Sequence, residues 1–250
     1  MIEPICHQMW KTEMIPDAFK EPTSQVKSLC ESLGWTYRVW TESQWMEVIE
    51  SHYKFLQKTY ELLNIIQKVH LAKYVLLYHF GGLYLDLDVA PTAHLKAWMT
   101  SDKHLIIARE QNNYSLGIFL ARAKHPFFKQ LIYDIIHYKP TQIATTFRHY
   151  DTLARTGTNL IDTHIEKLDK LDSDIHIQSA EQPLVTKVNH TAPSTWREWD
   201  SYVFDYVQYA WQYRDRIMLT SGVLLALVIL ILIALVFKKL RKQQRDHLIV

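Results

Sequence analysis

Two aspartates separated by a single residue, Asp86 and Asp88, have the types and the spacing that most directly suggest chemistry. They follow the short apolar run 83–85 and a pair of glycines. If these residues form one strand, the two carboxylates face the same side, with their Cα atoms roughly 6.5–7 Å apart. Carboxylates so placed repel each other unless a cation lies between them, and their oxygens suit Mg²⁺ or Mn²⁺. Because both cations also bind phosphate oxygens, the pair predicts a divalent metal that holds a phosphorylated substrate.

Two classes of enzyme use such a pair, and a solvent-exposed strand end is the non-catalytic alternative. In nucleotide-sugar transferases the metal bridges the diphosphate and neutralises the leaving group. In aspartyl-phosphate phosphatases the first aspartate is the nucleophile, and a later lysine and a second acidic pair are needed. A second acidic pair after an apolar strand is not evident in this sequence. The transferase is therefore the preferred interpretation, and a phosphatase that uses Asp86 is the alternative.

Alternating strands and helices are expected to position the pair. Strands are expected at residues 2–10, 35–40 and 83–89. Helices are expected at residues 22–33 and 41–53, with two more between 56 and 78. This order predicts an α/β fold with a mainly parallel sheet. Ligands of such sheets bind beyond the carboxyl ends of the strands, which is where Asp86 and Asp88 stand.

The signal weakens further along the chain. A strand is expected at 104–109, a helix at 126–138 and a short strand at 176–178. The chain has two cysteines, Cys6 and Cys30, and no spacing supports a bridge, so we expect free thiols.

Residues 217–237 form an uncharged run of 21 residues whose centre reads VLLALVILILIALV. At about 1.5 Å per residue, a helix of this length spans about 30 Å, the thickness of the hydrocarbon core of a bilayer. A buried core helix is the alternative, but the run has no polar face. We therefore expect a C-terminal transmembrane helix.

The net charge of +2 combines two unlike parts. Residues 238–250 carry five lysines or arginines against Asp246, which gives this tail +4 and leaves −2 for the rest. The folded part therefore lacks the cation excess of a nucleic-acid binder. A composition of 48% hydrophobic and 22% charged residues also excludes a disordered tail, a collagen-like fibre and a disulfide scaffold.

Four tyrosines precede the expected span, at positions 202, 206, 209 and 213, and their spacing puts them on one helical face. Such a stripe suits the membrane–water interface, and packing on the domain's own core is an equal alternative. We divide the chain into a catalytic domain at 1–200, an aromatic juxtamembrane helix at 201–216, the span at 217–237 and a basic tail at 238–250.

The side of the membrane that the catalytic domain faces stays undecided. The positive-inside rule places the basic tail in the cytosol and the domain outside. The N-terminus, MIEPICHQMW, shows no signal peptide, which favours a cytosolic domain. The sequons at Asn113 and Asn189 permit glycosylation without showing it.

Several stretches resemble, in order, the motifs of glycosyltransferase family 32, the DXD-containing sugar transferases. Residues 2–11 (IEPICHQMWK) resemble the family's opening IPKIIHQIW, and residues 35–41 resemble its strand W-x-Y-x-L-W-(D/T). Residues 69–89 (VHLAKYVLLYHFGGLYLDLDV) resemble the central motif A-D-x-x-R-Y-x-x-L-x-x-x-G-G-x-Y-x-D-x-D. Shorter pieces resemble the family at 112–118, 125–127, 155–157 and 190–196. The resemblance covers roughly residues 2–197 and is most specific at 69–89.

The resemblance implies a GT-A type nucleotide-sugar-binding fold and retaining transfer from a donor such as GDP-mannose or a UDP-hexose, with Mn²⁺ or Mg²⁺. Carried over by position, Asp88 is the main metal ligand, Asp86 contacts the ribose or the sugar, and His190 meets the metal or the diphosphate. The residues implied around the nucleotide are His7, Gln8, Trp10, Lys73, Tyr74 and Trp196. Several have structural alternatives, with His7 as a satisfied core histidine, His190 as a loop histidine, and Trp10 and Tyr74 as packing residues.

The sequence departs from the family's pattern at three positions. His70 stands in place of the motif's aspartate and Lys73 in place of its arginine, while Thr158 stands where proline is usual. A lysine keeps the charge of arginine but loses its two-pronged geometry. These changes imply altered donor choice or lowered activity.

The sequence as a whole thus predicts a membrane-anchored, metal-dependent retaining glycosyltransferase. It is expected to move a hexose, with mannose as the first choice, from a nucleotide sugar to a lipid or glycan acceptor. The alternatives are the phosphatase named above and a catalytically inactive nucleotide-sugar-binding protein.

Overall fold

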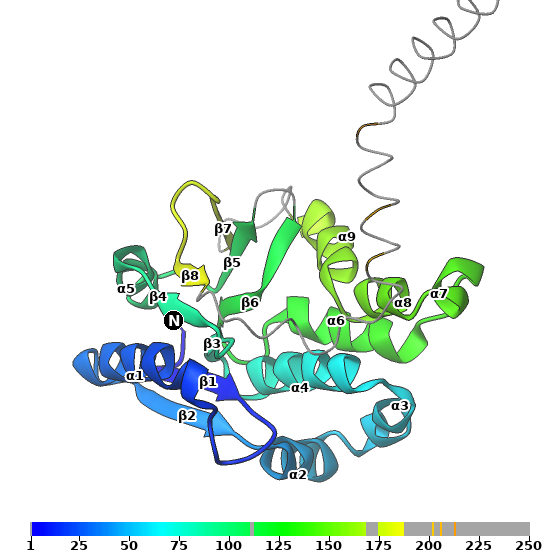
Figure 1. Ribbon diagram of the computed structural model, residues 1–250, viewed down its shortest axis with the longest axis horizontal. Helices are drawn as coiled ribbons and strands as arrows, with labels where there is room; N and C mark the ends of the chain where they lie inside the picture. Colours follow the sequence, from blue (N-terminus) through cyan, green and yellow to red (C-terminus); the bar gives the residue numbers. More distant parts are fainter. Residues whose placement is uncertain are drawn as a thin grey trace, which may run out of the picture. The chain divides into compact units, whose positions relative to one another are not determined.

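The computed structural model describes residues 2–110, 113–168 and 175–187, together with Tyr202, Tyr206 and Tyr213. The chain divides into two compact units, Met1–Arg197 and Glu198–Val250. The helices and strands given below lie in the first unit (Figure 1).

A six-stranded sheet forms the centre of the first unit, in the order β2-β1-β3-β6-β5-β7. Its strands are β2 (Thr36–Trp40), β1 (Ile5–Met9), β3 (Gly82–Leu85), β6 (Asn113–Ala121), β5 (Leu105–Glu110) and β7 (Ile175–Gln178). Strand β1 pairs parallel with β2 and β3, and β5 pairs parallel with β7, whereas β6 runs antiparallel to β3 and β5. This arrangement confirms the α/β fold with a mainly parallel sheet.

Helices cover both faces of the sheet (Figure 1). They are α1 (Asp17–Ser32), α2 (Glu42–His52), the 3-10 helix η1 (Lys54–Leu56), α3 (Gln57–Leu62), α4 (Ile65–Phe80), α5 (Ala93–Met99), α6 (Pro126–His137), α7 (Gln142–Thr146), α8 (Arg148–Arg155) and α9 (Thr158–Leu168). One core packs α2, α4, α6 and α9 against the sheet, and a second packs α1 and α5 against its other face. Burial of these apolar faces holds the three layers together.

Local sequence signals define both ends of α4, the helix that carries Lys73. At its start, Asn64 Oδ1 accepts hydrogen bonds from the amides of Ile66 and Gln67, and Gln67 Oε1 accepts from the Asn64 amide. This capping box satisfies amides that have no partner within the helix. At its end, Gly81 and Gly82 have φ of +68° and +91°, which side chains disfavour. The two glycines end the helix and turn the chain into β3.

The strand expected at 83–89 is wrong, because the aspartate pair does not lie within one strand. Strand β3 ends at Leu85, residues 87 and 88 form a turn, and β4 (Val89–Pro91) begins a second sheet. Strand β4 pairs antiparallel with β8 (Val185–Lys187) in that two-stranded sheet. The chain leaves the central sheet after the Asp86 amide donates to the Gly117 carbonyl at 2.9 Å. The two aspartates thus stand in a connection between two sheets.

The start of the first helix differs from the expectation, whereas the state of the two cysteines agrees with it. Helix α1 begins at Asp17 rather than Pro22, and Pro22 lies within it. A proline removes one backbone hydrogen bond but does not forbid a helix whose buried face, here Val26 and Cys30, is packed. Both cysteines, Cys6 and Cys30, are buried free thiols, as expected.

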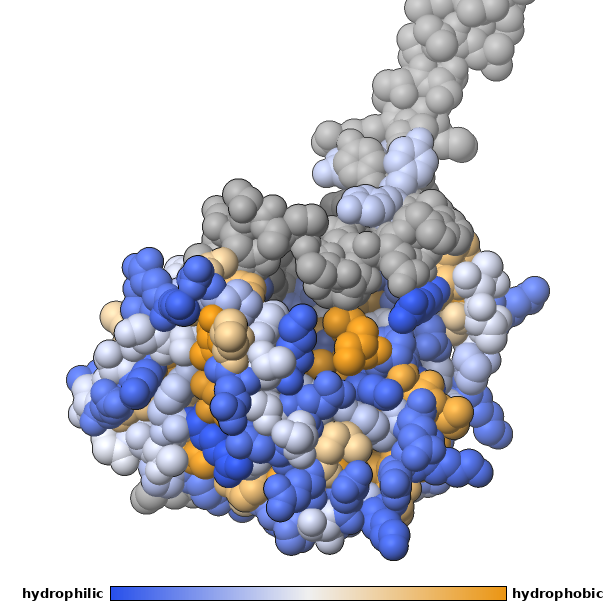
Figure 2. Space-filling model, turned by 60° about the horizontal axis from the view of Figure 1, so that its bottom comes forward, coloured by the Kyte–Doolittle hydropathy of each residue, from blue (hydrophilic) through white to orange (hydrophobic). Residues whose placement is uncertain are grey.

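The membrane-related predictions fall mostly outside the described residues. This is true of the expected span at 217–237, the basic tail at 238–250 and Tyr209. Tyr202 and Tyr206 are helical, and the expected juxtamembrane helix at 201–216 stays a prediction. Within the part of the chain that the structure describes, no helix has the length and apolar character needed to cross a bilayer. The face of the molecule in Figure 2 is largely hydrophilic, with scattered hydrophobic side chains between the polar ones.

Candidate active site

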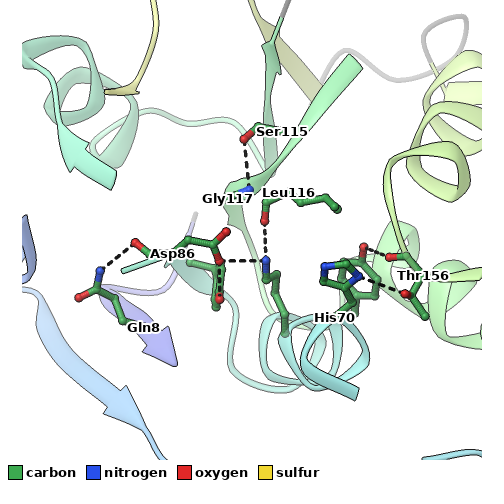
Figure 3. Close-up of polar contacts among 10 residues, drawn as sticks. Gln8, His70, Asp86, Ser115, Leu116, Gly117 and Thr156 are labelled. Carbon is green, nitrogen blue, oxygen red and sulfur yellow. Dashed lines mark hydrogen bonds and ion pairs between the residues drawn. The ribbon is translucent and has the colours of Figure 1, made fainter. Parts of the chain in front are cut away.

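Asp86 lies directly after β3, at the carboxyl edge of the central sheet, and both neighbouring strands hold its backbone. Its amide donates to the carbonyl of Gly117 on β6 at 2.9 Å. Its carbonyl accepts a hydrogen bond of 3.2 Å from Gln8 Nε2 on β1 (Figure 3). Gln8 is in turn fixed by the Tyr37 hydroxyl, which donates to Gln8 Oε1 at 2.6 Å. The predicted nucleotide-site residue Gln8 therefore positions the backbone of Asp86.

One oxygen of the Asp86 carboxylate is fully occupied by protein donors. Oδ1 accepts from Lys73 Nζ at 3.1 Å and from the Tyr84 hydroxyl at 2.8 Å. Lys73 Nζ also donates to the Leu116 carbonyl at 2.6 Å and lies 4.4 Å from the centre of the Tyr84 ring. Burial, followed by the negative charge of Asp86, raises the pKa of Tyr84 well above its ordinary value, so its hydroxyl remains a donor. Lys73 and Tyr84 thus fix the orientation of this carboxylate.

The second oxygen of Asp86, Oδ2, faces Gly117. A Cβ added at Gly117 would lie 3.2 Å from Oδ2, closer than ordinary van der Waals contact. The Asp86 side chain is 37% exposed, while its partner Lys73 is only 2% exposed. Because glycine has no side chain, residue 117 leaves the space beside Oδ2 unfilled.

Asp88 is partly exposed in the turn between β3 and β4. After burial and Asp86, its negative charge also raises the pKa of Tyr84, which places both carboxylates within electrostatic reach of that phenol. Within the described ranges no group of three or more His, Cys, Asp or Glu side chains converges on one point. The other predicted ligand, His190, and Trp196 lie outside the described residues.

The donor set fits Mn²⁺ or Mg²⁺ bound together with a substrate. Both aspartates keep solvent-accessible surface at the sheet edge, and hard oxygen ligands suit these cations. Mg²⁺ is commonly held by one or two carboxylates and completes its shell with water and substrate phosphates. Since Lys73 already neutralises Asp86, Asp88 is the stronger candidate for the direct ligand.

His7 is a buried residue with both ring nitrogens in use. Trp40 Nε1 donates to His7 Nδ1 at 2.9 Å, so Nε2 carries the proton and donates to the Gly81 carbonyl at 2.8 Å. Burial, only partly offset by the Gly81 hydrogen bond, lowers the pKa of His7 to about 4. The neutral ring ties β1 to β2 and to the start of β3. The position of His7 beside the nucleotide stays a prediction. Because both ring nitrogens have partners, His7 could contact a nucleotide only by packing against it.

Tyr74 and Trp10 differ in burial. The Tyr74 hydroxyl donates to the Thr156 carbonyl at 2.7 Å, and the ring is fully buried against Phe119 and Phe128. Tyr74 therefore supports the site from within the core. Trp10, by contrast, is partly exposed and packs edge-on against Phe19, with ring centres 5.7 Å apart. Its ring remains accessible beyond the carboxyl end of β1.

Comparison with known proteins agrees with this geometry. Residues 16–105 match the family described as "Glycosyltransferase sugar-binding region containing DXD motif". The matched stretch contains the D-x-D spacing at Asp86 and Asp88. It includes Lys73 and Tyr84 as well as Asp86 and Asp88, so the matched DXD region contains the ion pair described above.

Curated relatives of the DXD region are fungal mannosyltransferases. "Inositol phosphoceramide mannosyltransferase 1" of Schizosaccharomyces pombe is 29% identical over 133 residues, which cover 52% of this chain and 42% of the relative. "Mannosyl phosphorylinositol ceramide synthase SUR1" of Saccharomyces cerevisiae is 28% identical over 145 residues, 55% of this chain and 36% of that protein. The chain thus spans about two fifths of the length of the curated relatives it matches.

Solved glycosyltransferase structures align with this chain at TM-scores below 0.5. "PaToxG Glycosyltransferase" aligns with a TM-score of 0.47 and 13% identity, over 69% of this chain and 71% of that one. The "UDP-bound glycosyltransferase domain from the YGT toxin" aligns with a TM-score of 0.43 and 12% identity, over 70% of this chain and 59% of that one.

Three residues around the DXD region have contacts that sequence reasoning did not predict. His70, the departure from the family motif, has its Nδ1 3.1 Å from Thr156 Oγ1 (Figure 3). Burial and the charge of Lys73 lower its pKa to about 3, so the ring is neutral at physiological pH. Thr156 lies in the piece at 155–157 that resembles the family, but its contact with His70 was not predicted, because the two residues are 86 positions apart. Gly117 lies in the piece at 112–118, but its place beside Asp86 was not predicted, since it depends on the pairing of β6 with β3.

Proposed function

We propose that this chain is a metal-dependent retaining glycosyltransferase that moves a hexose, with mannose as the first choice, from a nucleotide sugar to a lipid or glycan acceptor. The observation that supports this most is the Asp86 carboxylate, held by Lys73 and Tyr84 in the DXD turn at the carboxyl edge of the sheet. A donor diphosphate would bind beside this carboxylate and Asp88, since ligands of such sheets bind beyond the carboxyl ends of the strands.

The roles follow from this geometry. Asp88 would hold the Mn²⁺ or Mg²⁺, with His190 as a further ligand. When bound, the metal neutralises the diphosphate leaving group. Asp86 Oδ2 would accept a hydrogen bond from a hydroxyl of the ribose or sugar, while Lys73 holds the carboxylate in place. Trp10 and Trp196 would border the nucleotide.

Mannose and a lipid acceptor follow from the names of the relatives, which are mannosyltransferases of inositol phosphoceramide. A GT-A type fold, an aromatic helix at 201–216 and a membrane anchor at 217–237 complete the proposal. An anchor would hold the site close to a lipid acceptor. The neutral His70 replaces a carboxylate of the family motif, so the preference between GDP-mannose and a UDP-hexose is the first property to measure.

The test is nucleotide-sugar hydrolysis by the full-length protein in detergent, with GDP-mannose and UDP-hexoses, in the presence of Mn²⁺ or EDTA. Turnover that needs Mn²⁺ and is abolished in Asp88→Ala and in Asp86→Ala would support the proposal. Asp102→Ala, an exposed aspartate outside the site, is the matched control and should behave as the unaltered protein. Full activity in both DXD variants would refute this mechanism.

The two alternatives give different results in the same assays. A phosphatase would form a phosphoenzyme analogue with beryllium or aluminium fluoride at Asp86 and would hydrolyse no nucleotide sugar. An inactive protein, suggested by His70 and Lys73, would show no turnover; calorimetry with GDP and Mn²⁺ would then report whether it still binds the nucleotide.

A further inference from the structure

A second cluster of polar and aromatic side chains lies where α2 and α4 end, at the opposite end of β3 from Asp86. His52 is the last residue of α2 and Tyr53 follows it, while His79 lies in the last turn of α4. Lys124 lies between β6 and α6, in the connection that passes these helix ends. None of these residues belongs to the site described above.

The hydrogen bonds of the cluster fix which groups can still donate. Lys124 Nζ lies 3.1 Å from the Tyr53 hydroxyl, and that hydroxyl lies 3.1 Å from His79 Nδ1. An ammonium can only donate hydrogen bonds, so the Tyr53 hydroxyl accepts one from Lys124. The same hydroxyl can donate a hydrogen bond to His79 Nδ1. In the neutral ring, His79 Nε2 then carries the hydrogen and is left as a donor. The His52 ring lies beside it, with ring centres 4.5 Å apart.

The backbone at Lys124 is strained, and the strain orients its side chain. Lys124 has a φ of +59°, the one positive φ at a non-glycine residue in the described part of the chain. Its amide donates to the Tyr78 carbonyl at 2.7 Å, which holds this conformation. The ammonium consequently lies 4.8 Å from the centre of the Tyr78 ring and 5.7 Å from that of Tyr53. Strain of this kind is often found where a side chain must be aimed at a ligand.

The cluster has no negative partner among the residues that the structure describes. No recorded ion pair joins a carboxylate there to Lys124, His79 or His52. The carboxylate that reaches this connection, Glu3, accepts a hydrogen bond from the Ala123 amide at 2.9 Å. Burial lowers the pKa of His79, and the positive charges of Lys124 and His52 lower it further. An anion bound between these groups would offset the repulsion and raise the pKa of His79.

We propose that Lys124, His79 and His52 form a binding site for a phosphate group, carried either by inorganic phosphate or by a phospholipid. The ammonium supplies a point charge, and the imidazole N–H groups supply directional donors to the phosphate oxygens.

The test follows the C2 protons of the histidines by NMR in the full-length protein in detergent, with inorganic phosphate added at constant ionic strength. The midpoint of the His79 titration should rise by about one pH unit, whereas the exposed His94 on α5 should not move. Lys124→Gly is the informative variant, since glycine suits a φ of +59° and the fold should keep or raise its melting temperature. In this variant the phosphate-induced rise should disappear, and Lys124→Arg should keep most of it.

Dihexanoyl phosphatidic acid and dihexanoyl phosphatidylcholine serve as further probes, which distinguish a lipid headgroup from inorganic phosphate. A larger His79 response to phosphatidic acid than to inorganic phosphate would identify a lipid headgroup, and the reverse a soluble anion. An unchanged His79 midpoint with every probe, or a rise that persists in Lys124→Gly, would overturn the site. The result is independent of the proposed transferase activity, because Asp88→Ala should retain the phosphate response and Lys124→Gly should retain nucleotide-sugar turnover.

Discussion

Lys73 and Asp86 form an ion pair whose two members differ in burial, since Lys73 is 2% exposed and Asp86 is 37% exposed. The cost of burying the ammonium is offset by the Leu116 carbonyl and the Tyr84 ring as well as by Asp86. The Asp86 carboxylate remains sufficiently exposed to contact a ligand. The pair therefore places a fixed but accessible oxygen at the end of β3.

Replacing Lys73 by methionine should damage activity more than folding. The variant leaves Asp86 unoriented, so we expect kcat/KM for nucleotide-sugar hydrolysis to fall about 100-fold. The free energy of unfolding should change by less than about 2 kcal/mol, because methionine refills the volume and the exposed Asp86 can hydrate. Steady-state kinetics and urea unfolding measure the two effects. A loss of stability with unchanged kcat/KM would show that the pair is merely structural.

Two glycine substitutions should separate activity from stability. In Gly117→Ala the new Cβ would lie 3.2 Å from Asp86 Oδ2, so turnover should drop at least tenfold while the melting temperature stays nearly constant. In Gly34→Ala no atom lies within 4 Å of the new Cβ, but the φ of +70° is unfavourable. That variant should lose about 1 kcal/mol of stability and keep its activity. Equal activity in the two variants would contradict the open space beside Oδ2.

Acid should destabilise the fold through His7. Its pKa is about 4 in the folded protein and 6.5 ordinarily, so between these values the unfolded chain binds more protons. The stabilisation by neutral His7 is complete above pH 6.5 and is lost as the pH falls towards 4. Between pH 7 and pH 4.5 this amounts to about 2–3 kcal/mol. His70, with a pKa lowered to about 3, contributes in the same direction.

The matched experiment compares unfolding free energies of the unaltered protein and His7→Phe at both pH values. The variant loses the hydrogen bonds to Trp40 and Gly81 and should be less stable at pH 7. Its stability should nevertheless fall less between pH 7 and pH 4.5, because one titrating group is gone. A pH dependence as steep as that of the unaltered protein would argue against His7 as its source.

Tyr74→Phe should test the link between α4 and the end of α8. The variant leaves the Thr156 carbonyl without its 2.7 Å hydrogen bond in a buried setting, which should cost about 1–2 kcal/mol. Tyr78→Phe, a partly exposed tyrosine on the same helix, is the control and should change stability little. Equal losses in the two variants would mean that the Tyr74 hydroxyl has no special role.

Sequence patterns predict the fold well up to residue 85, where local signals and tertiary structure agree. The apolar face of α4 and the Gly81–Gly82 stop act locally, so its limits are predictable. The break in the strand after Leu85 is not predictable, because LYLDLDV alternates as one strand would and contains no glycine or proline. Only the pairing of the Asp86 amide with Gly117, and of β4 with β8, decides it. Strand β6 was missed because its apolar run was interpreted only as a family motif.

The candidate site shows the same division. Asp86 and Lys73 are predictable from the motif, and the Tyr84–Asp86 contact follows from their spacing of two. The contact of His70 with Thr156 depends on where α8 ends against α4, which no pattern in either segment specifies. The prediction of His7 beside a nucleotide was based on its motif alone, whereas the hydrogen bonds from Trp40 and to Gly81 depend on strand register.

The antiparallel strand β6 has a consequence for how the chain can be divided. Strand β6 follows both β3 and β5 in the sequence, yet it lies between them in the sheet. A fragment cut at residue 105, the end of the family match, would leave the hydrogen-bonding edge of β3 open and apolar. Such edges promote intermolecular pairing, so this fragment should aggregate rather than fold. During synthesis, too, the DXD turn can take its final shape only after residues 113–121 have emerged from the ribosome.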